Sequence, residues 1–380
     1  MKVLNVNMSL DPVTGGGTAE RTFQISKFLA KVGIECTVLT TDLGLTPERI
    51  KAMERVRIIA LLCLFRRFYV PKFSYKQIKN IVEGVDVVHL MGHWTFMNAL
   101  VYLAAHSLNK PYVVCPAGAL PIFGRSWFIK KMYNILIGNK IILNAWGHVA
   151  IPHDEIKHFQ AYGVAPENVT VIPNGINAED FKSADVDEFR RKHHLADYPI
   201  ILFVGRLNPI KGPDLLLEAF SLAKRKLPHY HLVFAGPDGG MLAELKNLAD
   251  NFDLGERIHF IGYVGGDQKS QAYHAADILI IPSRQEAMSI VVLEAGITGT
   301  PVLLTDKCGF DLIGEINGGM VVEASAEALS EGIITLLKDT KKLQNMGKNL
   351  KRYVQENYTW EIIIKRYISM YETILMDTEK

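Results

Sequence analysis

The residues of this chain best suited to chemistry are two carboxylates, Glu286 and Glu294, with seven residues between them. Glu286 follows an apolar run typical of a strand, and Glu294 lies in an apolar run typical of a helix. We therefore expect one carboxylate on a loop and the other on the helix after it. The unpaired amides and the dipole of a helix N-terminus favour an anion there. The pattern predicts a site for a ligand that carries hydroxyl groups and a phosphate.

Two cations follow another strand pattern, at 199–204. Arg206 and Lys211 lie in the segment 205–212, where Gly205 permits a tight turn. The planar guanidinium of arginine binds phosphate oxygens in pairs, and lysine adds a point charge. The segment is either a phosphate-binding loop or a solvated basic loop.

Glycines follow two more strand patterns. Gly15, Gly16 and Gly17 come after the first strand, where they let a ligand approach the backbone, and a helix pattern after them offers amides. Gly236 follows the strand pattern 231–235 and either walls a pocket or makes a turn. The first glycine run lacks the G-x-G-x-x-G spacing of dinucleotide-binding enzymes. We therefore reject an oxidoreductase.

The elements that must position these residues alternate between strand and helix. Strand patterns cover 2–8, 35–40, 85–90, 111–115, 148–152 and 169–172 in the first half, and 199–204, 231–235, 258–261, 278–281 and 301–304 in the second. Helix patterns lie between them, for example at 18–32 and 154–162. The alternation predicts an α/β fold of doubly wound parallel sheets, in which ligands bind beyond the carboxyl ends of the strands.

The length of 380 residues favours two domains. A turn-rich break at 173–177 divides the chain, so we expect domains at 1–175 and 176–358. The amphipathic segment 359–380 is expected to be a terminal helix that packs back on the first domain. The natural ligand site is then the cleft between the two domains.

The composition excludes several classes of protein. A net charge of +2 gives no sign of nucleic-acid binding, and no apolar run approaches the ~20 residues of a membrane span. The chain begins in a strand pattern without a signal peptide, so we expect a cytoplasmic protein. Its four cysteines are widely spaced, as expected of free thiols in a reducing compartment: Cys36, Cys63, Cys115 and Cys308.

Some residues are candidates for metal or ligand binding on weaker evidence. His89 and His93 follow a strand pattern, so they are candidates for donor or acceptor contacts, although a lone histidine is more often structural. The pair Asp185 and Asp187 resembles a metal-binding D-x-D, but it lies outside any strand end, and we interpret it as a helix start. His193-His194 has no nearby zinc ligands in the sequence. We expect no metal site and no cofactor.

In their joint order, these segments resemble the retaining glycosyltransferases of family 4, which have the GT-B fold of two Rossmann-like domains facing a central cleft. The resemblance covers nearly the whole chain and is strongest over 200–305. It rests on Gly15–Gly17, Pro173–Ile176, Gly205–Leu207, Lys211-Gly212, Gly236-Pro237, Ala276-Asp277, Pro282-Ser283, Glu286, Glu294-Ala295 and Gly299–Val302.

The resemblance implies transfer of a hexose from a nucleoside diphosphate sugar, with the anomeric configuration kept and without a metal. It implies that Arg206 and Lys211 bind the diphosphate. Glu294 then binds the ribose hydroxyls, and Glu286 is the catalytic carboxylate, either a nucleophile or only a ligand of the donor sugar. It also places the backbone amides of Met288, Ser289 and Ile290 at the phosphates.

The chain departs from the family pattern at three positions. Phenylalanine often stands where this chain has Met288, and glycine where it has Ser289. Ser289 is therefore expected to cap the helix or to give its hydroxyl to a phosphate. Ala117 replaces a histidine or arginine that many relatives carry. This last change leaves open a non-catalytic nucleotide-sugar-binding subunit.

The remaining expectations concern substrates. We expect a UDP-sugar donor, with UDP-glucose as the first choice, and a saccharide or lipid-linked glycan acceptor of polysaccharide biosynthesis. Apolar residues beside clustered cations at 56–69 and 127–133 suggest peripheral contact with the inner face of a membrane. The first segment is otherwise a core strand with a basic loop, and the second an ordinary amphipathic helix. Another GT-B enzyme, such as a phosphorylase or an epimerase, is the alternative activity.

Overall fold

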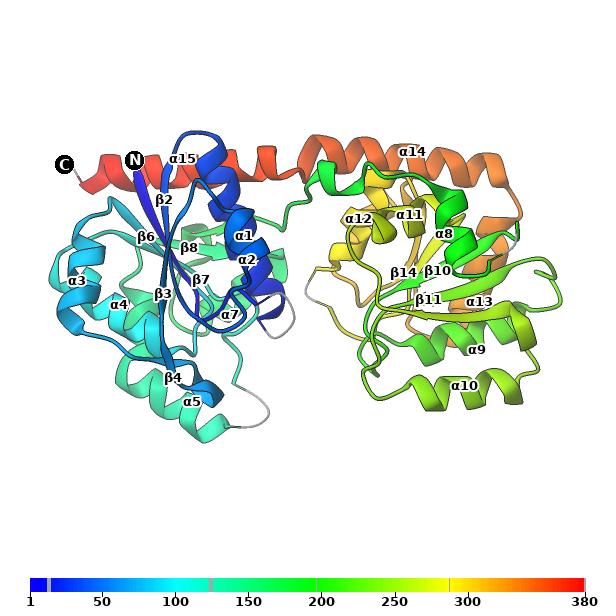
Figure 1. Cartoon of the computed structure of the whole chain (residues 1–380), viewed down its shortest axis with the longest axis horizontal. Coiled ribbons are helices and arrows are strands. Elements are labelled where there is room, and N and C mark those ends of the chain that lie inside the picture. Colours follow the sequence, from blue (N-terminus) through cyan, green and yellow to red (C-terminus); the bar gives the residue numbers. More distant parts are fainter. Residues whose placement is uncertain (12–14, 123–125, 196, 287, 379–380) are drawn as a thin grey trace. The chain divides into compact units, whose positions relative to one another are not determined.

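The computed structural model describes residues 1–11, 15–122, 126–195, 197–286 and 288–378. The chain divides into two compact units (Figure 1). Unit 1 comprises Met1–Asn174 with Trp360–Lys380, and unit 2 comprises Gly175–Thr359.

Unit 1 is built on a seven-stranded parallel sheet in the order β3-β2-β1-β6-β7-β8-β9. Its strands are β1 (Lys2–Val6), β2 (Glu35–Thr41), β3 (Arg57–Leu61), β6 (Val87–Met91), β7 (Tyr112–Cys115), β8 (Gly147–Ala150) and β9 (Val169–Val171). Its helices are α1 (Gly16–Lys31), α2 (Pro47–Lys51), α3 (Tyr75–Glu83), α4 (Phe96–Ser107), α5 (Trp127–Tyr133), α6 (Asn139–Leu143), α7 (Ile156–Gln160) and α15 (Trp360–Thr378). A π-helix, η2 (Asn134–Gly138), joins α5 to α6, and 3₁₀ turns are η1 (Arg66–Phe68), η3 (His153–Glu155) and η4 (Pro166–Asn168). The antiparallel pair β4 (Cys63–Phe65) and β5 (Val70–Pro71) forms a separate small sheet.

Unit 2 is built on a six-stranded parallel sheet in the order β12-β11-β10-β13-β14-β15. Its strands are β10 (Ile200–Val204), β11 (His231–Ala235), β12 (Ile258–Gly262), β13 (Ile278–Ile281), β14 (Val302–Thr305) and β15 (Gly319–Val322). Its helices are α8 (Val186–Lys192), α9 (Pro213–Ala223), α10 (Leu242–Asn251), α11 (Asp267–Ala275), α12 (Ile290–Thr298), α13 (Ala326–Leu337) and α14 (Thr340–Asn357), with 3₁₀ turns η5 (Ala178–Phe181), η6 (Gly255–Arg257) and η7 (Asp311–Ile313).

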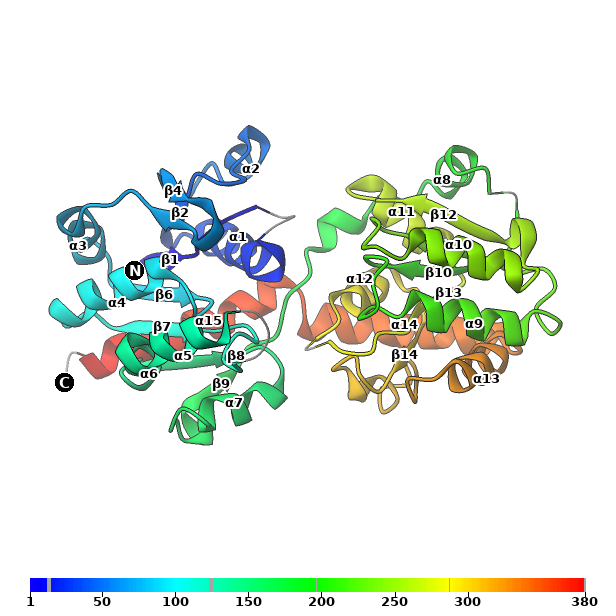
Figure 2. The same ribbon diagram turned by 90° about the horizontal axis from the view of Figure 1, so that it is seen from below.

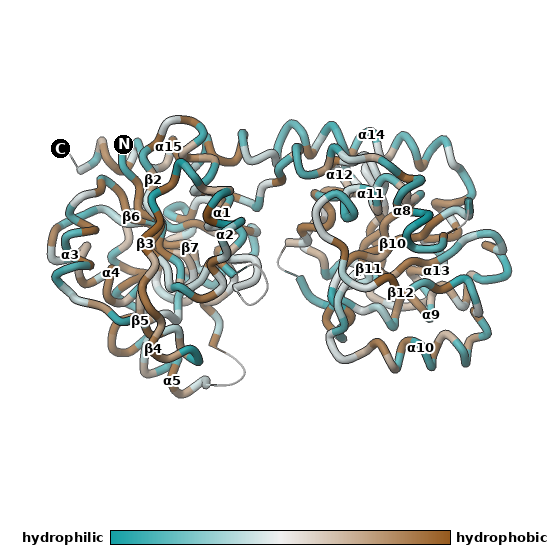
Figure 3. Tube along the Cα trace, viewed as in Figure 1, coloured by the Kyte–Doolittle hydropathy of each residue, from teal (hydrophilic) through white to brown (hydrophobic). Residues whose placement is uncertain are grey.

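The strands of unit 2 are apolar along their length because helices cover both faces of the sheet (Figures 1 and 2). In β10, Ile201 and Phe203 enter the core beneath α9, α10 and α13. The alternate residues Ile200 and Leu202 enter the core beneath α11, α12 and α14. The strands therefore form the hydrophobic centre of the unit in Figure 3, with hydrophilic positions concentrated on the outer helices.

Both sheets reverse their strand order at one place, between β1 and β6 in unit 1 and between β10 and β13 in unit 2. Neighbouring strands there send their following chain in opposite directions, so that the loops after them open a crevice at the carboxyl edge. The candidate residues of 205–212 and 282–289 follow the two strands that flank this switch point in unit 2.

The terminal helix α15 belongs to unit 1, where a buried arginine holds it. Arg21 of α1 is 2% exposed. Its guanidinium donates to the Tyr367 hydroxyl of α15 (2.6 Å) and to the side-chain oxygen of Asn174 at the end of the unit (2.6 Å). Phe28 of α1 also stacks on Trp360. One charged side chain thus joins three segments that are distant in the sequence.

Every strand predicted above is present, with each end within two residues of the prediction, and the doubly wound α/β prediction is confirmed. The helix start at Asp185 is also confirmed, because its carboxylate accepts from the Glu188 amide as the N-cap of α8 (2.9 Å). The helix predicted over 154–162 is shorter than expected. It consists of η3 and α7, and Gly163 at φ +90 ends the turn after α7.

Two edge strands differ from the sequence interpretation. The segment 56–69 was interpreted either as a contact with a membrane or as a core strand with a basic loop. It forms edge strand β3, strand β4 and η1. Edge strand β15 was not predicted.

All four cysteines are free thiols, and burial raises the pKa of Cys36 to about 12 and of Cys115 to about 11. Among the described residues, no helix is long and apolar enough to cross a membrane.

Candidate active site

Three loops at the carboxyl edge of the unit 2 sheet are bonded to one another through their backbones. The Leu207 amide, in the loop after β10, donates to the Pro237 carbonyl in the loop after β11 (3.0 Å). The Arg284 amide, in the loop after β13, donates to the Ile210 carbonyl (2.8 Å). The Arg284 side chain also pairs with Asp214 at the start of α9 (2.6 Å). The loop after β10 is therefore held from both sides.

Glycines are required where these loops meet. A Cβ atom on Gly236 would lie 1.8 Å from the Gly205 carbonyl oxygen. Gly212 has φ +65, and a Cβ atom there would lie 2.1 Å from the Pro282 carbonyl oxygen. Side chains at these positions would separate the loops, so the glycines set the spacing of the charged residues that the loops carry.

Glu286 is fixed by three contacts on the loop after β13. Its carboxylate pairs with the Lys211 ammonium (2.8 Å) and accepts a hydrogen bond from the Ser283 hydroxyl. Its amide donates to the Lys307 carbonyl (2.8 Å). The side chain is only 9% exposed. The carboxylate is thus oriented, and the structure brings together Glu286 and Lys211, which lie far apart in the sequence.

Glu294 makes a second lysine–glutamate pair, on α12. The buried carboxylate accepts a hydrogen bond from the Tyr273 hydroxyl (2.6 Å) and pairs with the Lys269 ammonium. Burial raises the pKa of Tyr273 well above its usual value, so its hydroxyl remains a donor at neutral pH. Neither Lys269 nor Tyr273 was predicted. They lie four residues apart on α11, and a polar pair at that spacing does not by itself point to a site.

Ser289 does not cap α12, which corrects the expectation for this residue. It occupies the N-cap position, but its side chain makes no cap hydrogen bond. Its amide donates to the Cys308 carbonyl (3.1 Å), so this amide is not free for an anion. Its hydroxyl is buried and has no hydrogen-bond partner among the described residues. No described residue accepts from the amides of Met288 or Ile290.

Arg206 is the exposed cation of the loop after β10. No described residue forms an ion pair or a hydrogen bond with its guanidinium. A Cβ atom on Gly239 would lie 2.8 Å from Arg206 Cγ, so the adjoining loop packs on the stem of this side chain. The head group therefore remains available to a ligand.

The glycine run in unit 1 stands at the N-terminus of α1. The Gly15 amide donates to the Asp11 carbonyl (2.9 Å), and a Cβ atom on Gly15 would lie 2.6 Å from Ala19 Cβ. Gly16 has φ +57, and Gly17 is exposed with open space around it. The preceding residues of this motif, 12–14, lie outside the described residues.

The two histidines of unit 1, which were candidates for ligand contacts or for a structural role, are enclosed in this structure. His89 lies inside β6, with its Nδ1 atom 2.8 Å from the Tyr371 hydroxyl of α15. His93 is 2% exposed, with its Nε2 atom 3.0 Å from the Asn134 side-chain oxygen. Burial lowers the pKa of His89 to about 3 and of His93 to about 4, so both rings are neutral at pH 7. The His89 Nε2 and His93 Nδ1 atoms are buried without a hydrogen-bond partner among the described residues, and contact of either ring with a ligand stays a prediction.

Two family models match consecutive parts of the chain. The model described as Glycosyltransferase Family 4 matches residues 15–180, and the model described as Glycosyl transferases group 1 matches residues 185–353. The chain belongs to the group 1 glycosyltransferases. It therefore belongs to a family of transferases, and its pairs of charged residues lie in the region that the second model matches.

Relatives of this glycosyltransferase differ in how much of their length they share with it. A glycosyltransferase of Methanocaldococcus jannaschii is 33% identical over 56% of this chain and 55% of its own length. D-inositol 3-phosphate glycosyltransferase of Geodermatophilus obscurus is 29% identical over 94% of this chain and 84% of its own length. The chain thus spans about half the length of the first relative and most of the second.

Solved structures establish the fold. HepE of Anabaena, solved with UDP, has a TM-score of 0.80 at 18% identity, over 98% of this chain and all of that one (100%). A glycosyltransferase of Rickettsia africae has a TM-score of 0.77 at 21% identity, over 98% of both chains. The two parallel α/β sheets are those of the GT-B fold.

Proposed function

We propose that this glycosyltransferase moves a hexose from a nucleoside diphosphate sugar, with retention of configuration, to a saccharide or lipid-linked acceptor in polysaccharide biosynthesis. The observation that carries the proposal is the pair of oriented lysine–glutamate contacts at one sheet edge of unit 2, Lys211 with Glu286 and Lys269 with Glu294. Carboxylates bind sugar hydroxyls, and cations bind a diphosphate. A nucleotide sugar carries both kinds of group.

In this proposal the diphosphate is bound by cations, the Ser289 hydroxyl and backbone amides, without a metal. Arg206 has no partner among the described residues, and the Lys211 side chain is 31% exposed. The buried Ser289 hydroxyl lacks a partner at the N-terminus of α12, next to the amides of Met288 and Ile290. These groups would stabilise the negative charge that develops on the leaving diphosphate.

The glycines are assigned to donor binding on two grounds. Gly236 lets its loop contact the Gly205 carbonyl, at the start of the loop that carries Arg206 and Lys211, and we assign it to the donor phosphates because it lies beside these cations. We assign Gly15, Gly16 and Gly17 to donor binding as well, because an N-terminus without side chains exposes the first amides of α1.

Transfer is proposed to proceed on one face of the sugar. The acceptor hydroxyl oxygen forms a bond to the anomeric carbon as the bond from that carbon to the diphosphate oxygen breaks. The hydroxyl proton passes to the leaving phosphate, so the products are the glycoside and the nucleoside diphosphate. Glu286 binds hydroxyls of the donor sugar, and its contacts with Ser283 and Lys211 orient it for this role.

UDP is the proposed nucleotide and glucose the first choice of sugar. HepE of Anabaena, which shares the fold, has been solved with UDP and with UDP-glucose. Another relative, from Salmonella typhimurium, is named as a lipopolysaccharide 1,2-N-acetylglucosaminetransferase and is 29% identical over 58% of this chain. These names support a nucleotide-sugar donor and a glycan acceptor.

Thermal unfolding with a panel of UDP, GDP, ADP and their sugars, with EDTA present, tests the donor assignment. UDP at a hundred times its dissociation constant should stabilise the protein by about 2.7 kcal/mol, which raises the melting temperature by several degrees. Glu294→Gln should weaken UDP binding roughly ten- to hundredfold, because the ribose loses a charged acceptor. Glu327→Gln, on the exposed start of α13, is the matched control. A shift with GDP or ADP alone would contradict the UDP assignment, and a shift lost in EDTA would contradict metal independence.

The acceptor side is proposed to contact the cytoplasmic face of a membrane. The helices α5 and η2 expose a run of apolar residues: Trp127, Phe128, Ile129, Met132, Ile135 and Leu136, each 40–67% exposed. The segment 87–153 contains five basic residues and no aspartate or glutamate. Leu64 and Phe65 of β4 are also exposed. The labels in Figure 1 show β4 and α5 at the same end of unit 1. An apolar surface among cations suits an anionic bilayer.

Flotation with vesicles tests this contact. The protein should float with vesicles that contain phosphatidylglycerol at low salt, and less with phosphatidylcholine vesicles or at high salt. The double variant F128E and L136E should abolish flotation, because it places two carboxylates in the apolar run. Leu222→Glu, at a 55% exposed apolar residue of α9, is the control and should float as the natural protein does. Failure to bind the anionic vesicles at low salt would overturn the membrane proposal.

A further inference from the structure

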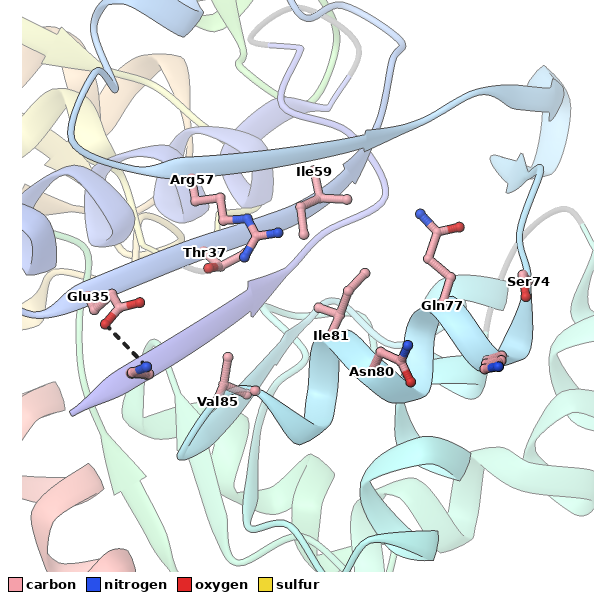
Figure 4. Close-up of a pocket in the computed structure, with 12 residues that line it drawn as sticks. Glu35, Thr37, Arg57, Ile59, Ser74, Gln77, Asn80, Ile81 and Val85 are labelled. Carbon is pink, nitrogen blue, oxygen red and sulfur yellow. Dashed lines mark ion pairs between the residues drawn. The ribbon is translucent and has the colours of Figure 1, made fainter.

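A cavity of about 530 Å³ lies within unit 1, at the amino ends of its strands. Its walls include the first residues of three neighbouring strands, Lys2 of β1, Glu35 of β2 and Arg57 of β3. Helix α3 forms the facing wall (Figure 4). The glycine run follows the other end of β1, so the cavity is at the opposite sheet edge from the expected donor loops of this unit. Its volume falls within the ~300–1,000 Å³ of small-molecule sites.

Most polar side chains of this cavity lack protein partners. No described residue forms a hydrogen bond or an ion pair with six of the side chains that line it: Thr37, Arg57, Ser74, Lys76, Gln77 and Asn80. Ser74 occupies the N-cap position of α3, but its hydroxyl makes no cap hydrogen bond. Thr37 is buried and the other five residues are exposed, so these groups are available to a polar ligand that enters the cavity.

The charges of the cavity favour an anion. Its acidic residue, Glu35, already pairs with Lys2 (3.6 Å). Arg57 and Lys76 remain as cations without a carboxylate partner among the described residues. The guanidinium of Arg57 is directed into the space between the sheet and α3 (Figure 4). A planar guanidinium with a second cation suits a phosphate or a carboxylate.

The rest of the wall favours a polyol. Gln77 and Asn80 lie three residues apart on α3 and thus on one side of it, where their amides can bond to hydroxyls. Ile59 of β3 and Ile81 of α3 point into the same space (Figure 4). They offer an apolar surface to the carbon skeleton of a ligand.

We propose that this cavity binds a small polyol that carries a phosphate or a carboxylate, such as a phosphorylated sugar or a sugar acid. Arg57 binds the anionic group, Gln77 and Asn80 bind hydroxyls, and Ile59 with Ile81 packs against the carbon skeleton. Lys76 adds positive charge to the wall. The site is separate from the proposed donor site, and the inference does not depend on the donor assignment.

Calorimetric titration of the whole protein with four probes tests the site. Glucose 6-phosphate and glucuronate carry both hydroxyls and an anionic group, and they should bind. Glucose has only the hydroxyls and inorganic phosphate only the anionic group, so each should bind more weakly. Arg57→Ala should weaken the two anionic sugars about tenfold or more. Arg55→Ala, at an exposed arginine outside the cavity, should leave them unchanged. Asn80→Leu should weaken glucose 6-phosphate but not inorganic phosphate.

The titration is repeated with saturating UDP, which separates this site from the donor site. The anionic sugars should bind equally well in its presence. Displacement by UDP, equal binding to the natural protein and R57A, or no binding of any probe at millimolar concentration would each overturn the proposal. A negative result for this cavity would not bear on the donor assignment, because the thermal unfolding experiment with nucleotides measures UDP binding alone.

Discussion

Replacement of Glu286 with glutamine is expected to reduce sugar transfer by about 10²–10³-fold or more. The carboxylate is almost buried and is oriented by the Ser283 hydroxyl and the Lys211 ammonium. Glutamine keeps the shape but removes one charged acceptor and adds an NH₂ group, so it cannot hold the donor sugar in the same orientation. The decisive measurement is the rate of sugar transfer from UDP-glucose with saturating donor, compared with that of the natural protein.

Nucleotide binding should survive the same substitution. Lys211 pairs with Glu286 in the absence of ligand, and the exchange to glutamine releases the ammonium for the diphosphate. We therefore expect the UDP affinity of E286Q to equal or exceed that of the natural protein. Glu315→Gln, at an exposed glutamate of the same unit, is the control. A hundredfold loss of UDP affinity would contradict the assignment of Glu286 to the sugar, and transfer at the natural rate would contradict any essential role.

The sheets could be predicted from the sequence because parallel strands covered on both faces must be apolar at nearly every position. The buried runs of β10 and β13 are examples, and the candidate residues follow them directly. The same logic placed Glu286 on a loop and Glu294 on a helix, as the structure has them. Edge strand β15 was not predicted because three of its four residues are only half-buried and two glycines stand at its start.

The contacts that depend on tertiary packing could not be predicted. Lys269 reaches Glu294 only because α11 lies beside α12, and 25 residues separate the two. His89 was a ligand candidate from its place near a strand end. Tyr371, 282 residues later, covers it. Ser289 does occupy the N-cap position, but the direction of its hydroxyl, which makes no cap hydrogen bond, could not be read from the sequence either.

The substitution of alanine for Gly236 is expected to remove most of the activity through geometry alone. The new Cβ atom would lie 1.8 Å from the Gly205 carbonyl oxygen, which is backbone and cannot rotate away. The loop after β10 must then shift, and Arg206 and Lys211 shift with it. A displacement of about 1 Å in a reacting group costs about 10²-fold in rate. Overpacking should also lower the free energy of unfolding by about 1–3 kcal/mol. Transfer rates and urea unfolding measure the two effects.

The control for this prediction is the same chemical change where space is available. Gly314 has an ordinary backbone conformation, and no atom lies within 4 Å of the position of an added Cβ. Gly314→Ala should therefore keep both the transfer rate and the free energy of unfolding. If G236A were as active as G314A, the loops after β10 and β11 would tolerate separation. The packed glycine contact would then not be what sets the position of the two cations.

If G236A instead lost UDP affinity along with transfer, as expected, the glycine would act through Arg206 and Lys211. Glu286, in contrast, is expected to affect transfer alone, so the two variants distinguish donor binding from orientation of the donor sugar.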